Sequence, residues 1–290
     1  MHSTSLRGRI ACFSTVGVAL IVLGGGTPAS AASGIPWPHS GQAVLMVDGR
    51  VLGTSGPVSR PQPIASVAKI MDAYQVLLDH PMGANDSGPT FTVLGYEAAA
   101  YRAERFSGQS LVPVSGGERI SERQALEAML LPSANDVARI LARWDAGSIP
   151  AFLRRENATA ARLGMSHTRY TDPAGVDSRT VSTAPDVLRL TQAAMALPAF
   201  ARIVGESRAT IPVAGTVHTI NPILGRGGVT GVKPGWTSAA GSCLVFSAHV
   251  RGKSGSDRSV YGVVLGQRGG SYTAAAAVAT RLIDSVRNAR

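Results

Sequence analysis

The chain has 290 residues, 44% hydrophobic and 16% charged, which is enough apolar material for one large domain or two intimate subdomains. It contains no low-complexity tract and no solenoid-length repeat, which excludes a disordered or repeat protein. The net charge of +10 indicates an anionic surface such as a cell wall as partner. Nucleic acid is not expected, because aromatic residues, which would stack on bases, make up only 5%.

The N-terminus has the pattern of a secretory signal peptide. Arg7 and Arg9 precede an uncharged apolar stretch over residues 10–25, and Ala29-Ser30-Ala31 forms a small-x-small cleavage site. An uncleaved anchor is the alternative, but the stretch is short for a membrane span. We therefore expect a secreted, extracytoplasmic, cell-wall-associated protein without a membrane span after signal cleavage. The expected organisation is a signal peptide at 1–31, a linker at 32–40 and one domain at 41–290.

The first third of the domain predicts a hairpin and a buried helix. Residues 43–47 are apolar and strand-like, Asp48-Gly49 is a hairpin-turn pair, and residues 50–53 return. A helix is expected over residues 67–78, which are mostly apolar. Residues 85–120 are expected to be irregular, with a short strand near residues 91–93.

Helices and then strands follow. Ser121 and Gln124 form a capping box for a helix ending near Leu131, and Thr183 begins another helix with Pro185. Further helices are expected at 135–144, 150–163 and 271–290, and strands at 210–217, 228–236, 242–251 and 258–266. The order strands, helices, strands, helix indicates an α/β fold of the α+β kind. We expect an antiparallel sheet from both chain ends, flanked by helices, with a helical subdomain inserted at about 85–205.

Lysine is rare in this basic chain. Of the 28 basic residues 25 are Arg, and the three Lys are Lys69, Lys233 and Lys253. Arg stays protonated at any working pH, whereas a desolvated Lys can lose its proton. Each Lys is therefore a candidate for a role that Arg cannot fill.

The segment Ser66-Val67-Ala68-Lys69 opens the predicted helix. A spacing of three places Ser66 and Lys69 on one helix face, one turn apart. A nearby amine of lowered pKa can take the Ser proton, and N–H groups at a helix start favour a developing oxyanion. The alternative is an N-cap Ser followed by a surface Lys.

Two further motifs could contribute chemistry. Ser133-Ala134-Asn135 follows Pro132 and is either a helix cap or a proton shuttle, Ser133, beside a substrate clamp, Asn135. Lys233-Pro234-Gly235 is either a turn or a second cation in the cleft, which would attract a carboxylate.

Together these pieces resemble the Ser-x-x-Lys, Ser-x-Asn and Lys-Thr-Gly set of penicillin-recognising serine enzymes. Over about residues 40–290 the chain is similar to D-alanyl-D-alanine carboxypeptidases of the low-molecular-weight penicillin-binding class. The segments Leu163–Thr168, Asp172–Asp177 and Val229–Lys233 also look like that family. The resemblance implies a β-lactamase/transpeptidase-like fold and hydrolysis of peptidoglycan stem peptides ending in D-Ala-D-Ala.

The resemblance also implies roles for single residues. Ser66 would be the nucleophile, Lys69 its base, and Ser133 and Lys233 would pass a proton to the leaving amine. The backbone N–H groups of Ser66 and Trp236 would form the oxyanion hole. The substrate-binding residues would be Asn135, Lys233, Gly235, Trp236 and Thr237. β-Lactam antibiotics would acylate the same Ser, and no metal or cofactor is expected.

Two departures concern recognition of the substrate carboxylate. Pro234 stands where the family usually has Thr, and Thr273 stands near where it often has Arg, with Arg268 the nearest replacement. A penicillin-binding cell-wall module with little turnover is therefore an alternative. A class A β-lactamase-like hydrolase is another, with Glu156 beside Asn157 as its extra acid, although this pair lies in a predicted helix. Cys243 is expected to be a small buried residue.

Overall fold

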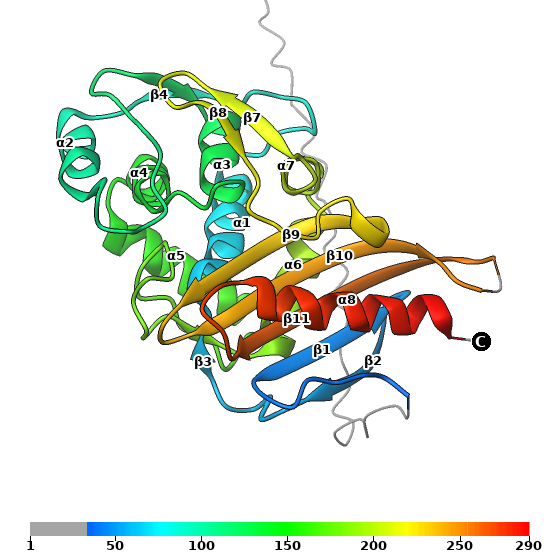
Figure 1. The fold of residues 1–290 in the computed structure, drawn as a ribbon. Coiled ribbons are helices and arrows are strands. Elements are labelled where there is room, and N and C mark those ends of the chain that lie inside the picture. The colour runs from blue at the N-terminus through cyan, green and yellow to red at the C-terminus, as the bar shows by residue number, and fades with distance from the viewer. Residues whose placement is uncertain (1–33, 254, 290) are drawn as a thin grey trace, which may run out of the picture.

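The computed structural model describes residues 34–253 and 255–289, and its centre is an antiparallel sheet built from both ends of the chain. The signal peptide predicted at 1–31 lies outside the described residues. The strand order is β2-β1-β11-β10-β9, which leaves β9 at one edge (Figure 1). The strands are β1 (Gln42–Val47), β2 (Arg50–Ser55), β9 (Val229–Thr237), β10 (Gly241–Arg251) and β11 (Asp257–Gln267). The predicted fold class is confirmed.

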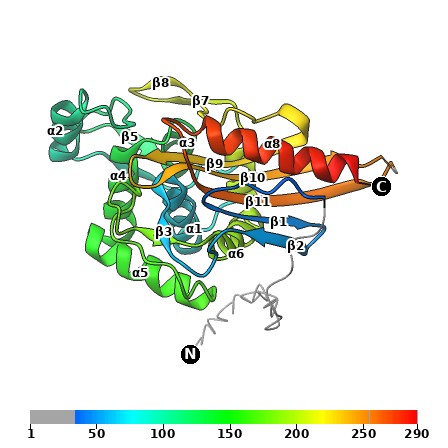
Figure 2. The ribbon, with the colours of Figure 1, turned by 60° about the horizontal axis from the view of Figure 1, so that its bottom comes forward.

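Helices cover both faces of this sheet. The C-terminal helix α8 (Thr273–Asn288) packs on β10 and β11, whereas α6 (Ala184–Met195) packs on the opposite face (Figure 2). Because successive side chains of a strand point to opposite faces, Leu244 joins the core under α8 and Val245 joins the core of the helical side. Cys243 is fully buried on that helical side, as expected, and burial raises its pKa to about 12.

The helices between β2 and β9 surround α1 (Lys69–Asp79). Its residues 69–77 are all buried, because α3, α4, α5, α6 and α7 pack around it. α2 packs on α4, farther out. The remaining helices are α2 (Gly95–Glu104), α3 (Glu122–Leu130), α4 (Asn135–Ala146), α5 (Ile149–Arg162) and α7 (Pro198–Val204).

Short elements complete the fold. Three two-stranded sheets pair β3 (Gln62–Pro63) with β6 (Val181–Ser182), β4 (Thr90–Thr92) with β5 (Arg119–Ser121), and β7 (Arg208–Ile211) with β8 (Gly215–His218). Two 3₁₀ turns are η1 (Ala65–Ala68) and η2 (Arg226–Gly228). Of these elements, η1 is the one that carries a site residue.

Several local predictions are confirmed. Asp48 and Gly49 both have positive φ, 47° and 77°, as a tight hairpin turn requires. Ser121 caps α3: its Oγ accepts from Gln124 N at 3.2 Å, and Gln124 Oε1 accepts from Ser121 N at 3.1 Å. Thr183 caps α6 through a bond from Asp186 N to Thr183 Oγ1 at 3.4 Å.

Other predictions are wrong. Residues 85–120 are not wholly irregular, because they contain α2, which starts at Leu94 without a Ser, Thr, Asp or Asn cap. The single strand expected over residues 210–217 is the hairpin of β7 and β8, which turns before Gly215, at φ 71°. The helix expected from residue 67 begins as the 3₁₀ turn η1 and becomes α-helical at Lys69.

Within the described residues, no single helix has the length and apolarity to cross a membrane. By length and composition alone the consecutive helices α6 and α7 reach this threshold together, with a bend of 108° between them. The apolar residues of both helices belong to the core of the helical side.

Candidate functional site

Ser66 and Lys69 lie side by side at the start of α1. Ser66 belongs to η1, Lys69 is the first residue of α1, and Lys69 Nζ lies 3.0 Å from Ser66 Oγ. The N-cap of α1 is Ala68, and Lys69 is 0% exposed. An N-cap Ser followed by a surface Lys is therefore the wrong interpretation of this motif.

Three oxygens surround the Lys69 amine. Besides Ser66 Oγ, Nζ lies 2.7 Å from Asn135 Oδ1 and 3.0 Å from the carbonyl oxygen of Ala174. The latter two can only accept, whereas a hydroxyl can also donate. An ammonium donates to all three oxygens, and a neutral amine donates to two and accepts from Ser66. The cage thus suits both protonation states of a base.

Burial allows the Lys69 amine to lose its proton at moderate pH. Desolvation lowers the pKa of Lys69 from its ordinary value to about 8, against the opposing charges of Asp72, Asp172 and Asp136. A Lys of this pKa is partly deprotonated near neutral pH and can accept a proton.

The second motif joins the first through Asn135. Its Oδ1 accepts from Lys69, and its Nδ2 donates to Gln109 Oε1 at 3.1 Å. Ser133 is 1% exposed, adopts φ 70°, and its Oγ has no hydrogen-bond partner among the described residues. It does not cap α4, whose N-cap is Ala134 without a side-chain bond. A buried hydroxyl held in an unfavourable conformation is typical of a functional position.

The third motif brings a second buried amine to the site. Lys233, on edge strand β9, is 0% exposed, and its Nζ donates to the carbonyl of Pro234 at 3.3 Å. Burial, together with the charge of Lys69, holds the pKa of Lys233 well below its ordinary value. Two of the three lysines are thus buried in one site, whereas Lys253 is exposed. The turn interpretation is wrong, because residues 229–237 form one strand.

Gly235 allows β9 to lie directly against Ser66. A Cβ at this position would lie 2.9 Å from the backbone N of Ser66 and 3.1 Å from that of Val67. Any side chain here would therefore push the strand away from η1. This close approach brings the backbone of Trp236, the next residue, to the N–H groups of η1, where the resemblance implies an oxyanion hole.

The residues after Gly235 hold the end of β9. Trp236 is 41% exposed, and its indole Nε1 donates to the carbonyl of Gly269 at 2.8 Å. Thr237 Oγ1 accepts from Ala240 N at 3.1 Å, which fixes the turn into β10. The exposed Arg268 precedes Gly269, so it lies beside this end of the strand.

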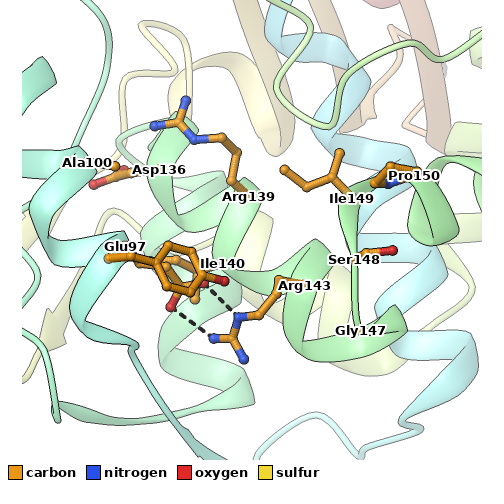
Figure 3. Close-up of a pocket in the computed structure, with 11 residues that line it drawn as sticks. Glu97, Ala100, Asp136, Arg139, Ile140, Arg143, Gly147, Ser148, Ile149 and Pro150 are labelled. Carbon is orange, nitrogen blue, oxygen red and sulfur yellow. Dashed lines mark hydrogen bonds and ion pairs between the residues drawn. The ribbon is translucent and has the colours of Figure 1, made fainter.

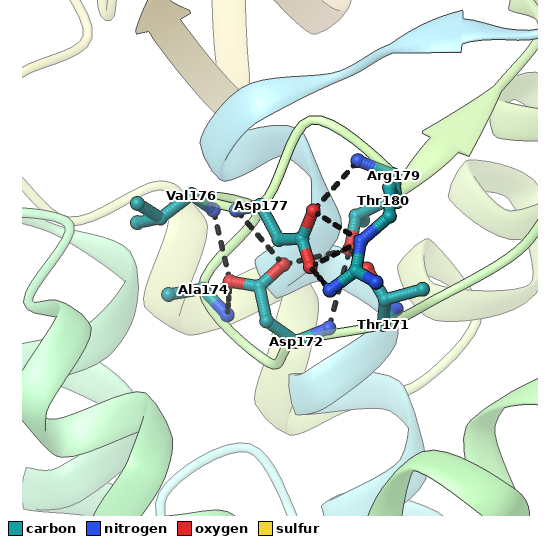
Figure 4. Close-up of polar contacts among 7 residues, drawn as sticks. All are labelled: Thr171, Asp172, Ala174, Val176, Asp177, Arg179 and Thr180. Carbon is teal, nitrogen blue, oxygen red and sulfur yellow. Dashed lines mark hydrogen bonds and ion pairs between the residues drawn. The ribbon is translucent and has the colours of Figure 1, made fainter.

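A loop that no motif of the sequence assigns to the site supplies the third contact of Lys69, the carbonyl oxygen of Ala174. Figure 4 shows the polar contacts within this loop. The carboxylate of Asp172 accepts from the backbone N–H groups of Ala174, Val176 and Asp177 and from the hydroxyl of Thr180. This network fixes the Ala174 carbonyl. The Asp-Pro-Ala-Gly pattern, noted only as a family likeness, was the available signal. Gln109 lies in an irregular stretch, and no sequence pattern marked it as a site residue.

The cavity shown in Figure 3 lies apart from these motifs. It has a volume of about 440 Å³ and lies between α2, α4 and the start of α5. Its Arg143 donates to both carboxylate oxygens of Glu97, at 2.7 and 2.9 Å, and its Arg139 pairs with Glu104. None of the predicted site residues lines it, and its cations already have partners.

The structure argues against the β-lactamase-like role of Glu156. The residue lies in the middle of α5 and is 0% exposed, with its carboxyl against Asp72. Because it is sealed from solvent, it cannot direct a water molecule from the cleft. Among the described residues, no group of three or more His, Cys, Asp or Glu could hold a metal ion.

Comparison with known proteins gives one family. A family model described as D-alanyl-D-alanine carboxypeptidase matches residues 32–269. A D-alanyl-D-alanine endopeptidase of Pseudomonas aeruginosa is 31% identical over 92% of this chain and 85% of its own. A D-alanyl-D-alanine carboxypeptidase of Mycobacterium tuberculosis is 36% identical over 53% of this chain and 55% of its own.

Solved structures give the same fold. A mutant of the Streptomyces K15 DD-transpeptidase covers 90% of this chain and 98% of its own, with 25% identity and a TM-score of 0.72. An evolved penicillin-binding protein homologue from Mycobacterium tuberculosis covers 89% and 95%, with 27% identity and a TM-score of 0.73. The chain belongs to the D-alanyl-D-alanine carboxypeptidase family.

Proposed function

We propose that the protein is a serine-type D-alanyl-D-alanine carboxypeptidase that removes the terminal D-alanine of peptidoglycan stem peptides. The observation that carries this proposal is the 3.0 Å contact between Ser66 Oγ and a fully buried Lys69 of lowered pKa. Family membership provides the substrate class, because the family is named for this reaction.

Acylation begins with proton transfer from Ser66 to Lys69. As the Ser66 Oγ–H proton passes to the neutral amine, Oγ attacks the carbonyl carbon between the two D-alanines. The oxyanion that forms accepts hydrogen bonds from the backbone N–H groups of Ser66 and Trp236. The absence of a side chain at Gly235 supports this assignment, since it lets the strand approach η1.

Collapse of the tetrahedral intermediate breaks the C–N bond. The leaving amine of D-alanine takes its proton from Ser133, whose hydroxyl is buried and has no other partner among the described residues, and Lys233 replaces that proton. Asn135 holds Lys69 through Oδ1, and it binds the substrate amide through the hydrogen bonds that its side-chain amide can still make. Lys69 then passes the proton it took from Ser66 to Lys233, which restores both amines. Neutral again, Lys69 deprotonates a water molecule that attacks the acyl-enzyme, and this proton goes to Ser66 Oγ as the ester bond breaks and the second product leaves.

Endopeptidase activity is a second candidate. Two relatives, from Pseudomonas aeruginosa and Escherichia coli, are named D-alanyl-D-alanine endopeptidases and match 92% and 78% of this chain. The same acyl-enzyme serves both reactions, which differ in the amine that leaves: a free D-alanine or the side-chain amine of a cross-linked stem.

Export and wall association belong to this proposal. The pattern of residues 1–31 supports a signal peptide, and its removal takes away two Arg and no acidic residue, which leaves a net charge of +8. A basic enzyme is attracted to an anionic cell wall, where its substrate lies. β-Lactams, which present a strained amide in place of the D-Ala-D-Ala bond, are the expected inhibitors.

The test is turnover by the purified protein. A peptide ending in D-Ala-D-Ala should release free D-alanine, and Ser66→Ala should abolish the release. A cross-linked dimeric stem peptide in a parallel reaction separates the endopeptidase. Acylation by penicillin without hydrolysis of either peptide would instead support a penicillin-binding module with little turnover.

A further inference from the structure

A pair of buried carboxyl groups lies behind Lys69. Asp72 follows Lys69 by three residues on α1, so both side chains lie on one face of the helix. Glu156 reaches Asp72 from α5, which packs on α1, and both acids are 0% exposed. Apart from each other, their carboxyl oxygens have no hydrogen-bond partner among the described residues.

Such a pair needs a proton. Two carboxylates in contact repel each other, and both are shielded from bulk solvent here, so at least one must be protonated. Burial raises the pKa of both acids, but their neighbours differ. For Asp72, the bond to Glu156 and the charge of Lys69 favour the ionised form, and the charge of Asp172 is the one neighbouring charge that opposes it. Asp72, Asp172 and Asp145 all disfavour ionised Glu156. The proton therefore belongs on Glu156.

We propose that Asp72, kept ionised by a hydrogen bond from protonated Glu156, is the counter-charge of Lys69 and sets the proton affinity of this base. The inference rests on the proposed role of Lys69. When Ser66 transfers its proton, the neutral Lys69 amine becomes an ammonium in a buried site. The carboxylate of Asp72 stabilises that ammonium without touching the substrate, so Asp72 and Glu156 are positioning residues.

Other charged groups also face this cluster. The groups that act on Lys69 or on the pair, besides these three residues, are Asp136, Arg139, Asp145, Asp172 and Lys233. The Tyr170 hydroxyl is also fully buried and stays neutral, because burial raises its pKa well above the ordinary value. All of these groups are unchanged in the variants below, so a difference between variants reports the carboxyl pair.

The test is the pH profile of acylation by benzylpenicillin. The second-order rate constant should rise with pH as Lys69 loses its proton. In the double variant Asp72→Asn, Glu156→Gln the counter-charge is absent, so this rise should move to lower pH by about one unit or more. Glu156→Gln alone should leave the rise within about 0.3 unit of wild type, because the Gln amide still donates to ionised Asp72.

Two controls complete the experiment. Glu127→Gln removes a buried carboxyl whose neighbours are Arg123 and Glu206, and it should leave the profile unchanged. In the wild type, the ¹³C NMR signal of the Glu156 carboxyl, identified by its loss in Glu156→Gln, should report a protonated acid at pH 7. This measurement stands even if the double variant does not fold.

Two results would overturn the inference: a double variant that keeps the wild-type profile, or a Glu156 carboxyl that is ionised at pH 7. A wild-type protein that forms no adduct on Ser66 would instead overturn the proposed function. A flat wild-type pH profile would remove Lys69 as the base. Different results therefore overturn the role of the carboxyl pair and the proposed function.

Discussion

Lys69 can do what Arg cannot. Its cage of Ser66 Oγ, Asn135 Oδ1 and the Ala174 carbonyl accommodates both an ammonium and a neutral amine. Arg would keep the positive charge but could not give up a proton. In a chain with 25 Arg and three Lys, the two buried lysines both belong to this site.

Lys69→Arg should therefore lose acylation although the charge is kept. General-base catalysis contributes about a hundredfold or more, so the benzylpenicillin acylation rate should fall by at least that factor. The exposed Lys253→Arg is the matched control and should acylate at the wild-type rate, and thermal unfolding should confirm that both variants fold. Acylation of Lys69→Arg within about threefold of wild type would remove Lys69 from the role of base.

The edge strand β9 is the element on which carboxylate recognition depends. Its register with β10 is continuous from Gly231 to Thr237, so Pro234 leaves the pairing intact. An edge strand is where Pro is tolerated, since one side of it makes no ladder bonds. The consequence of Pro234 is the loss of the hydroxyl that the family usually has there.

Pro234→Thr should raise kcat/KM on a D-Ala-D-Ala peptide by roughly ten- to a hundredfold, as expected for one hydrogen bond to a charged group. The melting temperature should stay almost unchanged. Pro234→Val, which has the shape of Thr and the backbone N–H but no hydroxyl, should stay near the wild-type value. Equal gains from Thr and Val would show that the N–H, not the hydroxyl, is what matters. No gain from Thr would direct attention to Arg268 as the carboxylate partner.

The sequence predicted elements where the local signals were strong. The Asp48-Gly49 turn and the Ser121 and Thr183 caps act through their own side chains and backbone, so their positions were readable. Helix α2 has no Ser, Thr, Asp or Asn at its N-cap, where its start signal is limited to Glu97, whose Oε2 accepts from Leu94 N. Only two of its residues, Glu97 and Ala98, are buried, so no apolar stripe marks it.

The site residues also divide into those that a local sequence signal marks and those that none marks. Sequence motifs predicted four of the site residues, which are Ser66, Lys69, Ser133 and Lys233. Gln109 and the Ala174 carbonyl, by contrast, reach the site only through tertiary packing. A backbone carbonyl has no residue type to recognise. The partnership of Asp72 with Glu156 joins positions 84 residues apart, and no local pattern links them.

At the scale of the whole molecule, the sheet brings distant segments to one place. Strand β9 comes from the last quarter of the chain and η1 from the first, and they meet because β1, near the N-terminal end, pairs with β11 in the same sheet as β9. The helical side buries α1 and thereby desolvates Lys69. The proposed chemistry therefore requires the complete fold, and an unfolded chain with the same motifs should be inert.

The most direct measurement is the mapping of the penicillin adduct. The native protein is incubated with benzylpenicillin, digested, and analysed by mass spectrometry, with Ser66→Ala and heat-unfolded protein as controls. We expect one covalent adduct, on Ser66, that is absent from both controls. An adduct on any other residue, or one that persists in Ser66→Ala, would contradict the assignment of Ser66 as the nucleophile.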